Sequence, residues 1–263
     1  MDLGLKGRVA VVLAGSTGLG KAVARSLFDE GARVAICARD AARLEHTRSE
    51  LAGTRPEAIL AEPVDVTDSD RLVQFLTHVH RSWGRVDILV TNAGGPPTGR
   101  ASSLTLESLD AGYLLTLKSA VVAIRTVLPW MQAQRWGRII ALTSSSVRQP
   151  IENLVTSNTM RAGLTGYLKT LSREVARDGV LVNSICTGMF MTDRLRELIE
   201  TRARESGRSA AEELQRMESE IPLGRTGEPA ELAAVVAFLA SERASFLNGV
   251  ALSCDGGAGR HLL

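Results

Sequence analysis

The sequence predicts an α/β fold, a doubly wound parallel seven-stranded sheet with flanking helices, formed by a single domain over residues 1–263. Apolar strand-like runs alternate with amphipathic helical stretches, which is typical of parallel sheets. Most of the runs are continuously apolar, as expected of strands covered on both faces. The chain shows no linker, repeat or low-complexity segment, and 44% of its residues are hydrophobic, enough for one large core.

The first expected strand, residues 9–14, leads directly into a glycine-rich turn and then into an amphipathic helix expected over 19–30. A second such helix is expected over 68–83, and the apolar run 232–240 predicts a buried helix. The remaining expected strands cover residues 33–38, 58–65, 86–94, 138–144, 180–186 and 250–257.

Composition argues against several partners. The net charge of +2, from 31 basic and 29 acidic residues, does not suggest nucleic acid or an anionic membrane. No apolar run approaches the roughly 18 residues that a membrane helix requires, and residues 1–12 lack a signal-peptide layout. Three widely spaced cysteines, Cys37, Cys186 and Cys254, fit buried thiols in a reducing cytosol and no metal site. We therefore expect a cytoplasmic protein that acts on small molecules.

One segment interrupts the alternation. Residues 193–221 carry 14 charged residues in 29, with apolar positions that fit two short amphipathic helices separated by "SGRS". Ser209 and Glu212 fit a capping box for the second helix. Because this insertion follows a strand end, we expect a lid over a binding cleft, and the alternative is a solvated surface excursion.

The turn after the first strand, "AGSTGLGKAVA" at residues 14–24, carries Gly15, Gly18 and Gly20 between a strand and a helix. Glycine allows a sharp turn and a close approach of the backbone to a pyrophosphate. The helix N-terminus adds free N–H groups and the positive end of its dipole. The position of this turn predicts a dinucleotide site.

This spacing and later motifs resemble the short-chain dehydrogenase/reductase family, in particular its members similar to 3-oxoacyl-acyl-carrier-protein reductases. The resemblance spans nearly the whole chain and implies a Rossmann-type fold. In the family's glycine motif, Leu13 and Ala14 replace Thr-Gly, while Gly18 and Gly20 match. The other motifs are "PVDVTD", "TNAGG", "GRIIALTSSS", "LVNSICTGMFMT", "PLGRTGEPAELAAVVAFLAS" and "CDGG".

The resemblance also implies positions for the cofactor. Asp65 would hold the adenine amino group and Val66 would contact the ring. Thr192 would contact the carboxamide, and Gly188 follows Thr187 where the family has Pro-Gly. The turn residues Gly15, Ser16, Thr17, Gly18, Leu19 and Gly20 are expected around the pyrophosphate, and Asn92, Ala93 and Gly94 beneath the nicotinamide ribose.

The end of the second strand indicates which cofactor binds. An NAD site uses a carboxylate there for the ribose hydroxyls, whereas an NADP site uses a guanidinium for the 2′-phosphate. Ala38 occupies the acidic position and Arg39 follows. We therefore predict NADP(H), with NAD(H) left open if Arg39 only ends the strand in solvent.

The family's catalytic residues resemble Asn, Ser, Tyr and Lys in chain order. Here Thr116 takes the place of Asn, Ser144 keeps the serine, Ser157 replaces Tyr and Arg161 replaces Lys. Arg161 cannot relay a proton as a lysine would, but it can hold ribose hydroxyls and steady an oxyanion. With their i, i+4 spacing, Ser157 and Arg161 are expected to face Ser144 in the nicotinamide cleft and form the catalytic set.

The predicted function is an NADP(H)-dependent oxidoreductase of this family, transferring hydride to or from a carbonyl or hydroxyl substrate with an atypical site. General acid catalysis is typically worth 10²–10⁴-fold, so its loss impairs a catalyst without abolishing it. Two alternatives stay open. One is an inactive dinucleotide-binding protein acting through partners, and the other is a reaction that needs no strong acid, such as double-bond reduction. The substrate would be a small or acyl-type molecule, and the resemblance suggests a homotetramer or dimer.

Overall fold

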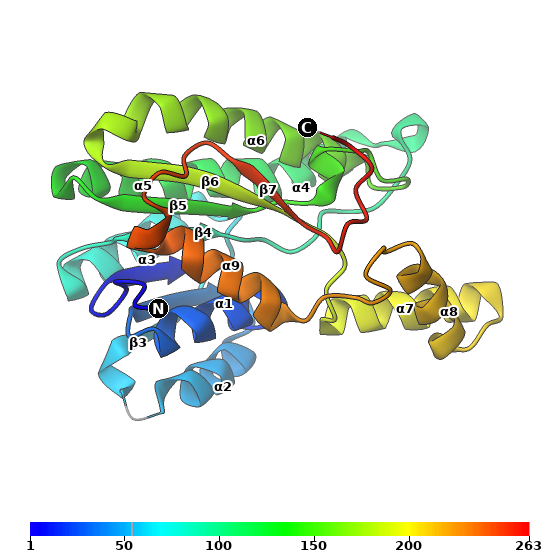
Figure 1. The fold of residues 1–263 in the computed structure, drawn as a ribbon, viewed down its shortest axis with the longest axis horizontal. Coiled ribbons are helices and arrows are strands. Elements are labelled where there is room, and N and C mark those ends of the chain that lie inside the picture. Colours follow the sequence, from blue (N-terminus) through cyan, green and yellow to red (C-terminus); the bar gives the residue numbers. More distant parts are fainter. Residues whose placement is uncertain (54, 263) are drawn as a thin grey trace.

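The computed structural model describes residues 1–53 and 55–262. Its centre is one parallel sheet with strand order β3-β2-β1-β4-β5-β6-β7, which confirms the predicted doubly wound α/β fold (Figure 1). The order reverses between β1 and β4, and ligands of open α/β sheets bind at such a switch point. The strands are β1 Val9–Val12, β2 Arg33–Ala38, β3 Ile59–Pro63, β4 Ile88–Thr91, β5 Gly137–Leu142, β6 Val180–Thr187 and β7 Ala251–Cys254.

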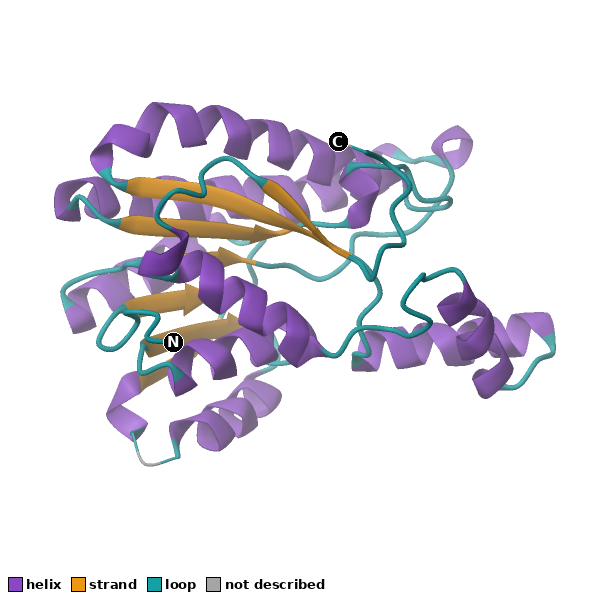
Figure 2. Ribbon diagram, viewed as in Figure 1, coloured by secondary structure: helices purple, strands orange, loops and turns teal. Residues whose placement is uncertain are grey.

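Helices cover both faces of the sheet and form two separate apolar cores (Figure 2). Helices α1 (Gly18–Asp29), α2 (Ala41–Ala52) and α9 (Pro229–Ala240) pack on one face. Helices α3 (Ser69–Trp83), α5 (Ser119–Gln134) and α6 (Val155–Val175) pack on the other. Burial of each strand on both sides explains why its sequence is continuously apolar.

Several strands end earlier than the sequence predicts. β1 stops at Val12 rather than at residue 14, and β4 stops at Thr91 rather than at residue 94. The residues beyond these ends leave the ladder and form loops at the carboxyl edge of the sheet. Apolar or small residues continue past the last ladder bond, so hydropathy alone cannot place the strand end.

One helical stretch corrects the expectation that no apolar segment reaches membrane length. Helix α4 (Leu106–Gly112), a π-helical turn over Tyr113–Lys118 and α5 join into the stretch Leu106–Gln134, whose length and hydropathy would suffice to span a membrane. Its inner face, including Ala123, Ile124 and Val127, is fully buried against the sheet. The packing of a core helix therefore accounts for its apolar character.

The charged segment after β6 forms two helices, α7 (Asp193–Ser206) and α8 (Ala210–Ser219). Ser209 and Glu212 make the capping box expected at the start of α8. Leu195, Ile199 and Met217 form a small apolar cluster of their own. The helix pair projects from the end of the molecule toward which the strand arrows point (Figure 2).

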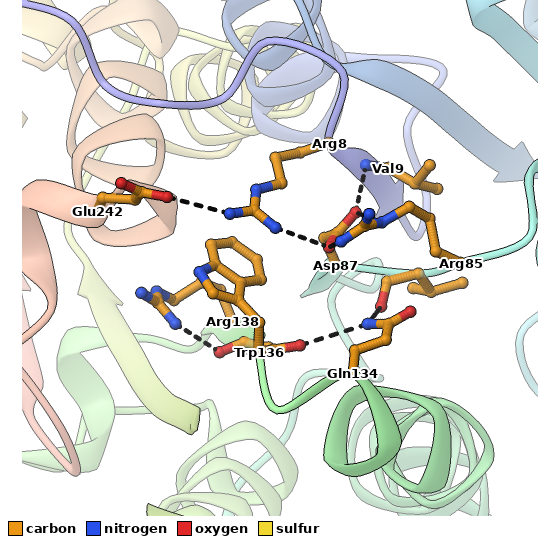
Figure 3. Close-up of polar contacts among 10 residues, drawn as sticks. Arg8, Val9, Arg85, Asp87, Gln134, Trp136, Arg138 and Glu242 are labelled. Carbon is orange, nitrogen blue, oxygen red and sulfur yellow. Dashed lines mark hydrogen bonds and ion pairs between the residues drawn. The ribbon is translucent and has the colours of Figure 1, made fainter. Parts of the chain in front are cut away.

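At the opposite edge of the sheet, one buried carboxylate joins the start of β1 to the start of β4 (Figure 3). Asp87 is fully buried and accepts hydrogen bonds from the backbone N–H of Val9 at 2.9 Å and from Arg85 at 2.6 and 2.8 Å. Arg8 lies 3.3 Å from the same carboxylate and also pairs with Glu242 at 3.0 Å. The network therefore fixes the register of the central strands far from the carboxyl edge.

Replacing Asp87 tests this anchor. Asp87→Ala should lower the free energy of unfolding by about 3–5 kcal/mol, because it leaves buried donors and a partly buried arginine without their anion. Glu242→Gln is the matched control and should cost at most about 1 kcal/mol, since Glu242 is largely exposed. Chemical denaturation of both variants measures the difference, and equal losses would show that Asp87 is not the anchor.

Candidate active site

The turn between β1 and α1 is held in an unusual backbone conformation. Ala14 has φ +49° and Gly18 has φ +52°, both in the left-handed region, whereas Gly15 does not. An alanine therefore adopts the conformation that glycine favours. Gly15 donates its N–H to the carbonyl of Cys37 at 3.0 Å, and a Cβ on Gly15 would lie 2.7 Å from the side chain of Ile36. The turn is thus pressed against the carboxyl end of β2.

A second contact joins this turn to the loop after β4. The side-chain amide of Asn92 donates to the carbonyl of Ala14 at 3.3 Å. A Cβ on Gly20 would overlap that same carbonyl and lie 2.9 Å from the Asn92 nitrogen. Gly20 is needed here because helix α1 approaches both loops closely. The structure therefore fixes the glycine turn and the Asn92 loop relative to each other.

These loops form one wall of a cleft of about 360 Å³ at the carboxyl edge of the sheet. The ends of β5 and β6, helix α6 and the start of α7 complete it. The cleft brings together many of the residues expected at the cofactor. They are Thr17, Gly18, Leu19, Asn92, Ala93, Gly94, Arg161, Gly188 and Thr192.

The other expected cofactor residues lie outside the lining of this cleft. Ser16 is buried, and its carbonyl accepts a hydrogen bond from the Thr47 hydroxyl at 2.8 Å. Asp65 follows β3, where its carboxylate accepts from the N–H and hydroxyl of Thr67 at 2.9 and 2.8 Å. Val66 beside it is buried. This pair lies beyond the end of β3, at the expected adenine end of the sheet edge.

Arg39 follows the last residue of β2, beside the glycine turn. Two residues earlier, the carbonyl of Cys37 accepts the N–H of Gly15. The Arg39 side chain is exposed, and no hydrogen bond or ion pair to it occurs among residues 1–53 and 55–262. Its guanidinium is therefore available to a phosphate at this end of the cleft.

Arg161 is the charged group at the inner end of the cleft. It projects from α6, and its Nη1 donates to the carbonyl of Leu142 at the end of β5, at 2.8 Å. Burial, and secondly the positive charge of Arg194, lower the pKa of Arg161 to about 10. The guanidinium stays charged at neutral pH, and its remaining N–H groups can serve a bound molecule.

Thr116 lies in a small cavity next to the cleft, shared with Asn92 and Arg161. It sits in the π-helical turn, its side chain is buried, and its hydroxyl has no partner among the described residues. Such turns inside α-helices are frequent at functional sites. Thr116, which stands where the family has asparagine, and Arg161 therefore line the same small cavity.

The two expected catalytic serines lie apart from the cleft lining. Ser144 caps a short 3₁₀ turn, with its hydroxyl accepting the N–H of Ser146 at 3.1 Å. Ser157 is buried in the first turn of α6. Of the three residues expected to form the catalytic set, Arg161 alone lines the cleft within the described part of the chain.

One cleft residue was missed by sequence reasoning. Arg194, in the first turn of α7, reaches across the cleft to the loop after β4, where a Cβ on Gly95 would overlap its guanidinium. Its only signal in the sequence is its place directly after the Thr192-Asp193 pair. In the sequence, nothing else distinguishes Arg194 from the other charged residues of the segment 193–221.

The site fits a dinucleotide. Thr17 caps α1, but its side chain makes no capping hydrogen bond, so its hydroxyl and the first N–H groups of the helix remain available for a pyrophosphate. A Cβ on Gly18 would lie 3.3 Å from the side chain of Thr192, so the glycine turn packs closely against the start of α7.

Known proteins share this architecture. A family model described as Enoyl-(Acyl carrier protein) reductase matches residues 13–259. The chain is 29% identical to 3-oxoacyl-[acyl-carrier-protein] reductase FabG of Aquifex aeolicus, over 98% of this chain and 99% of that one.

Two solved structures are also similar. The L-sorbose reductase of Gluconobacter frateurii, complexed with NADPH and L-sorbose, matches with a TM-score of 0.96 at 32% identity, covering 100% of both chains. An NADPH-bound short chain oxidoreductase of Pseudomonas aeruginosa PAO1, described as containing an atypical catalytic center, matches with a TM-score of 0.87 at 32% identity over 97% of both chains.

These matches confirm the predicted family and enzyme class, and they support NADP(H) as the cofactor. The family model alone covers almost the whole sheet and every loop of the cleft. The chain therefore belongs to the short-chain dehydrogenase/reductase family of NAD(P)-dependent oxidoreductases.

Proposed function

We propose that the protein is an NADP(H)-dependent carbonyl reductase or alcohol dehydrogenase in which a partly buried arginine, Arg161, acts at the substrate oxygen. One observation carries the proposal. Arg161 is a partly buried cation with a single described acceptor, and it lines the cleft together with the glycine turn and the Asn92 loop. The site uses this charge where most of the family would use a tyrosine and a lysine.

Bound nicotinamide supplies the hydride donor or acceptor. The glycine turn and the N-terminus of α1 hold the pyrophosphate, and the loop of Asn92, Ala93 and Gly94 supports the nicotinamide end. A bound reduced cofactor would supply hydride to the carbonyl carbon, and the Arg161 guanidinium would donate hydrogen bonds to the oxygen, where negative charge develops. Water in the cleft supplies the proton that completes the alcohol. Alignment of donor and acceptor can contribute about 7–11 kcal/mol, which exceeds the roughly 3–5 kcal/mol of a general acid.

Arg39 selects the cofactor in this proposal. A guanidinium at the end of β2 binds the 2′-phosphate, whereas the half-buried Ala38 offers no carboxylate to a ribose. Asp65 and Val66 would then hold the adenine. NADPH appears in both solved relatives, which supports the same choice here.

An inactive binding protein is the second candidate, and the position of the two serines favours it. Neither Ser144 nor Ser157 lines the cleft, so a tyrosine-like acid has no direct replacement there. Reduction of an activated double bond, or a lyase step, also remains compatible with a site that lacks a strong acid. NADPH consumption measured over ketones, aldehydes and enones separates the three candidates.

The surroundings of the site support a homo-oligomer in a reducing compartment. The edge strand β7 leaves Leu252 exposed, and Phe246 just before it is fully exposed, which offers an apolar face to a second copy. All three cysteines are free thiols, and burial raises the pKa of Cys37 to about 12, so it is an inert core residue. We propose a cytoplasmic tetramer or dimer acting on a small or acyl-type substrate.

The cofactor assignment predicts tighter binding of NADPH than of NADH. Arg39→Ala should reduce the difference between the binding free energies of NADPH and NADH by about 1.5–3 kcal/mol, the value of a charge-assisted hydrogen bond. Arg33→Ala is the control, because Arg33 is exposed at the opposite end of β2. Fluorescence titration with both cofactors gives the dissociation constants. Equal curves for NADPH and NADH in the unmutated protein would refute the assignment.

The role of Arg161 predicts a large loss of turnover on its removal. Arg161→Leu should lower kcat about 10²–10³-fold, as loss of a transition-state donor does. Because the pKa of Arg161 is about 10, the charge persists at neutral pH. Turnover limited by this charge should therefore be flat to about pH 9 and decline as pH rises through about 10. A pH-rate profile of the wild type measures this.

The double variant Ser157→Tyr with Arg161→Lys distinguishes the mechanisms further. It restores a proton donor with its charged neighbour, so turnover of a simple ketone should rise. Ser157→Tyr alone is the control for crowding in the first turn of α6.

Unchanged turnover in Arg161→Leu would show that Arg161 has no part in the chemistry.

A further inference from the structure

The cleft carries two arginines that approach from opposite sides. Arg161 comes from α6 and donates to the carbonyl of Leu142 after β5, whereas Arg194 comes from α7 and its guanidinium lies against Gly95 after β4. Among residues 1–53 and 55–262, neither has a carboxylate partner, and the Arg194 side chain has no hydrogen bond at all. Two cations held in one cleft repel each other, so the arrangement is costly unless an anion joins them.

The acidic side chain that lines the cleft does not neutralise both arginines. Asp193 is the one acidic residue that lines it in the described chain, and its carboxylate accepts a hydrogen bond from Arg196 at 3.2 Å. Two arginines against one aspartate leave the lining with an excess of +1 (2 − 1). Burial, and secondly the charge of Arg194, lower the pKa of Arg161.

An anion bound between these two arginines would lie away from the expected site of the cofactor phosphates. The pyrophosphate end of the cleft lies at Thr17 and Gly18, which approach Thr192. The guanidinium of Arg194 instead rests on Gly95, directly after the loop expected beneath the nicotinamide ribose. The absence of a side chain at Gly95 leaves the space that the guanidinium fills. Arg194 therefore projects to the side of the cleft where a substrate meets the nicotinamide.

We propose that Arg194 is a specificity-determining residue that binds an anionic group, a carboxylate, of an oxo-acid substrate whose carbonyl lies at Arg161. The planar fork of a guanidinium matches a carboxylate with two parallel hydrogen bonds. A lid residue in this role also couples substrate binding to lid position, because the anion holds α7 to the loop after β4. This inference rests on the proposed function for the carbonyl step, but not for the binding of the acid.

Equilibrium binding tests the inference without turnover. Acetoacetate and its methyl ester are titrated by calorimetry into the enzyme loaded with NADP⁺. The wild type should bind the acid at least about tenfold more tightly than the ester, and Arg194→Gln should remove that preference. Arg204→Gln is the matched control on the same helix, because Arg204 is exposed, lies outside the cleft lining and donates only to the Thr201 hydroxyl, so it should keep the preference. Gly95→Ala displaces the guanidinium by a different route and should act like Arg194→Gln.

The same variants locate the anion. If Arg194→Gln weakens NADP⁺ binding tenfold while the acid-to-ester ratio is unchanged, the guanidinium serves the cofactor and the inference is overturned. Equal binding of acid and ester by the wild type would also overturn it. If no carbonyl compound is turned over but the acid preference is present and depends on Arg194, the anion site stands while the proposed reaction fails.

Discussion

A guanidinium removed from water needs hydrogen-bond acceptors around it, and the described residues give Arg161 a single one, the carbonyl of Leu142. Even partial burial of such a charge is costly unless its donors are satisfied, and the side chain of Arg161 is partly buried where it lines the cleft. Helix α6 holds the backbone of Arg161 against the sheet through Leu164 and Leu168, which are buried in the core. The free donors are left to the cleft. Arg161 lines both the cleft, with the cofactor loops and the start of α7, and the small cavity that holds Thr116. The proposed chemistry of these parts therefore depends on its charge.

The rest of the site is arranged around it by close backbone packing. The Asn92 amide bound to the Ala14 carbonyl, and the lack of a side chain on Gly20, keep the glycine turn and the β4 loop in contact. Gly188 does the same at the end of β6, where a Cβ would lie 2.6 Å from the backbone of Asp255. These contacts lie at the carboxyl edge, while the buried Asp87 network fixes the same central strands at their other ends. The strands are therefore anchored at one end by the Asp87 network and carry the loops of the cleft at the other.

Much of this was predictable from local pattern, and the exceptions have physical reasons. Alternating apolar runs and helices predicted the sheet because each strand is buried on both faces. Ser157 and Arg161, expected to share a helical face from their i, i+4 spacing, both lie in the unbroken helix α6, but only Arg161 lines the cleft in the described part of the chain. The glycine motif was matched by spacing, yet Ala14 rather than Gly15 takes the left-handed conformation, a choice that side-chain type does not reveal. Arg194 was missed because its contact with Gly95 depends on the path of the lid in three dimensions. Ser144 was expected to face the cleft with Ser157 and Arg161, but its hydroxyl caps the following 3₁₀ turn, a local contact that the family resemblance does not reveal.

The family relationship shows an NAD(P)-dependent oxidoreductase, and the proposed function assigns the step at the substrate oxygen to Arg161. The solved relative described as having an atypical catalytic center shows that the fold is found with departures from the usual residues. The most direct measurement is transfer of deuterium from NADPH labelled at C4 of the nicotinamide, followed by mass spectrometry of the product from the carbonyl compound that supports the fastest NADPH consumption. An oxidoreductase organised by Arg161 should place one deuterium on the new carbinol carbon. Tight NADPH binding without any deuterium transfer, over ketones, aldehydes and oxo-acids alike, would contradict the account.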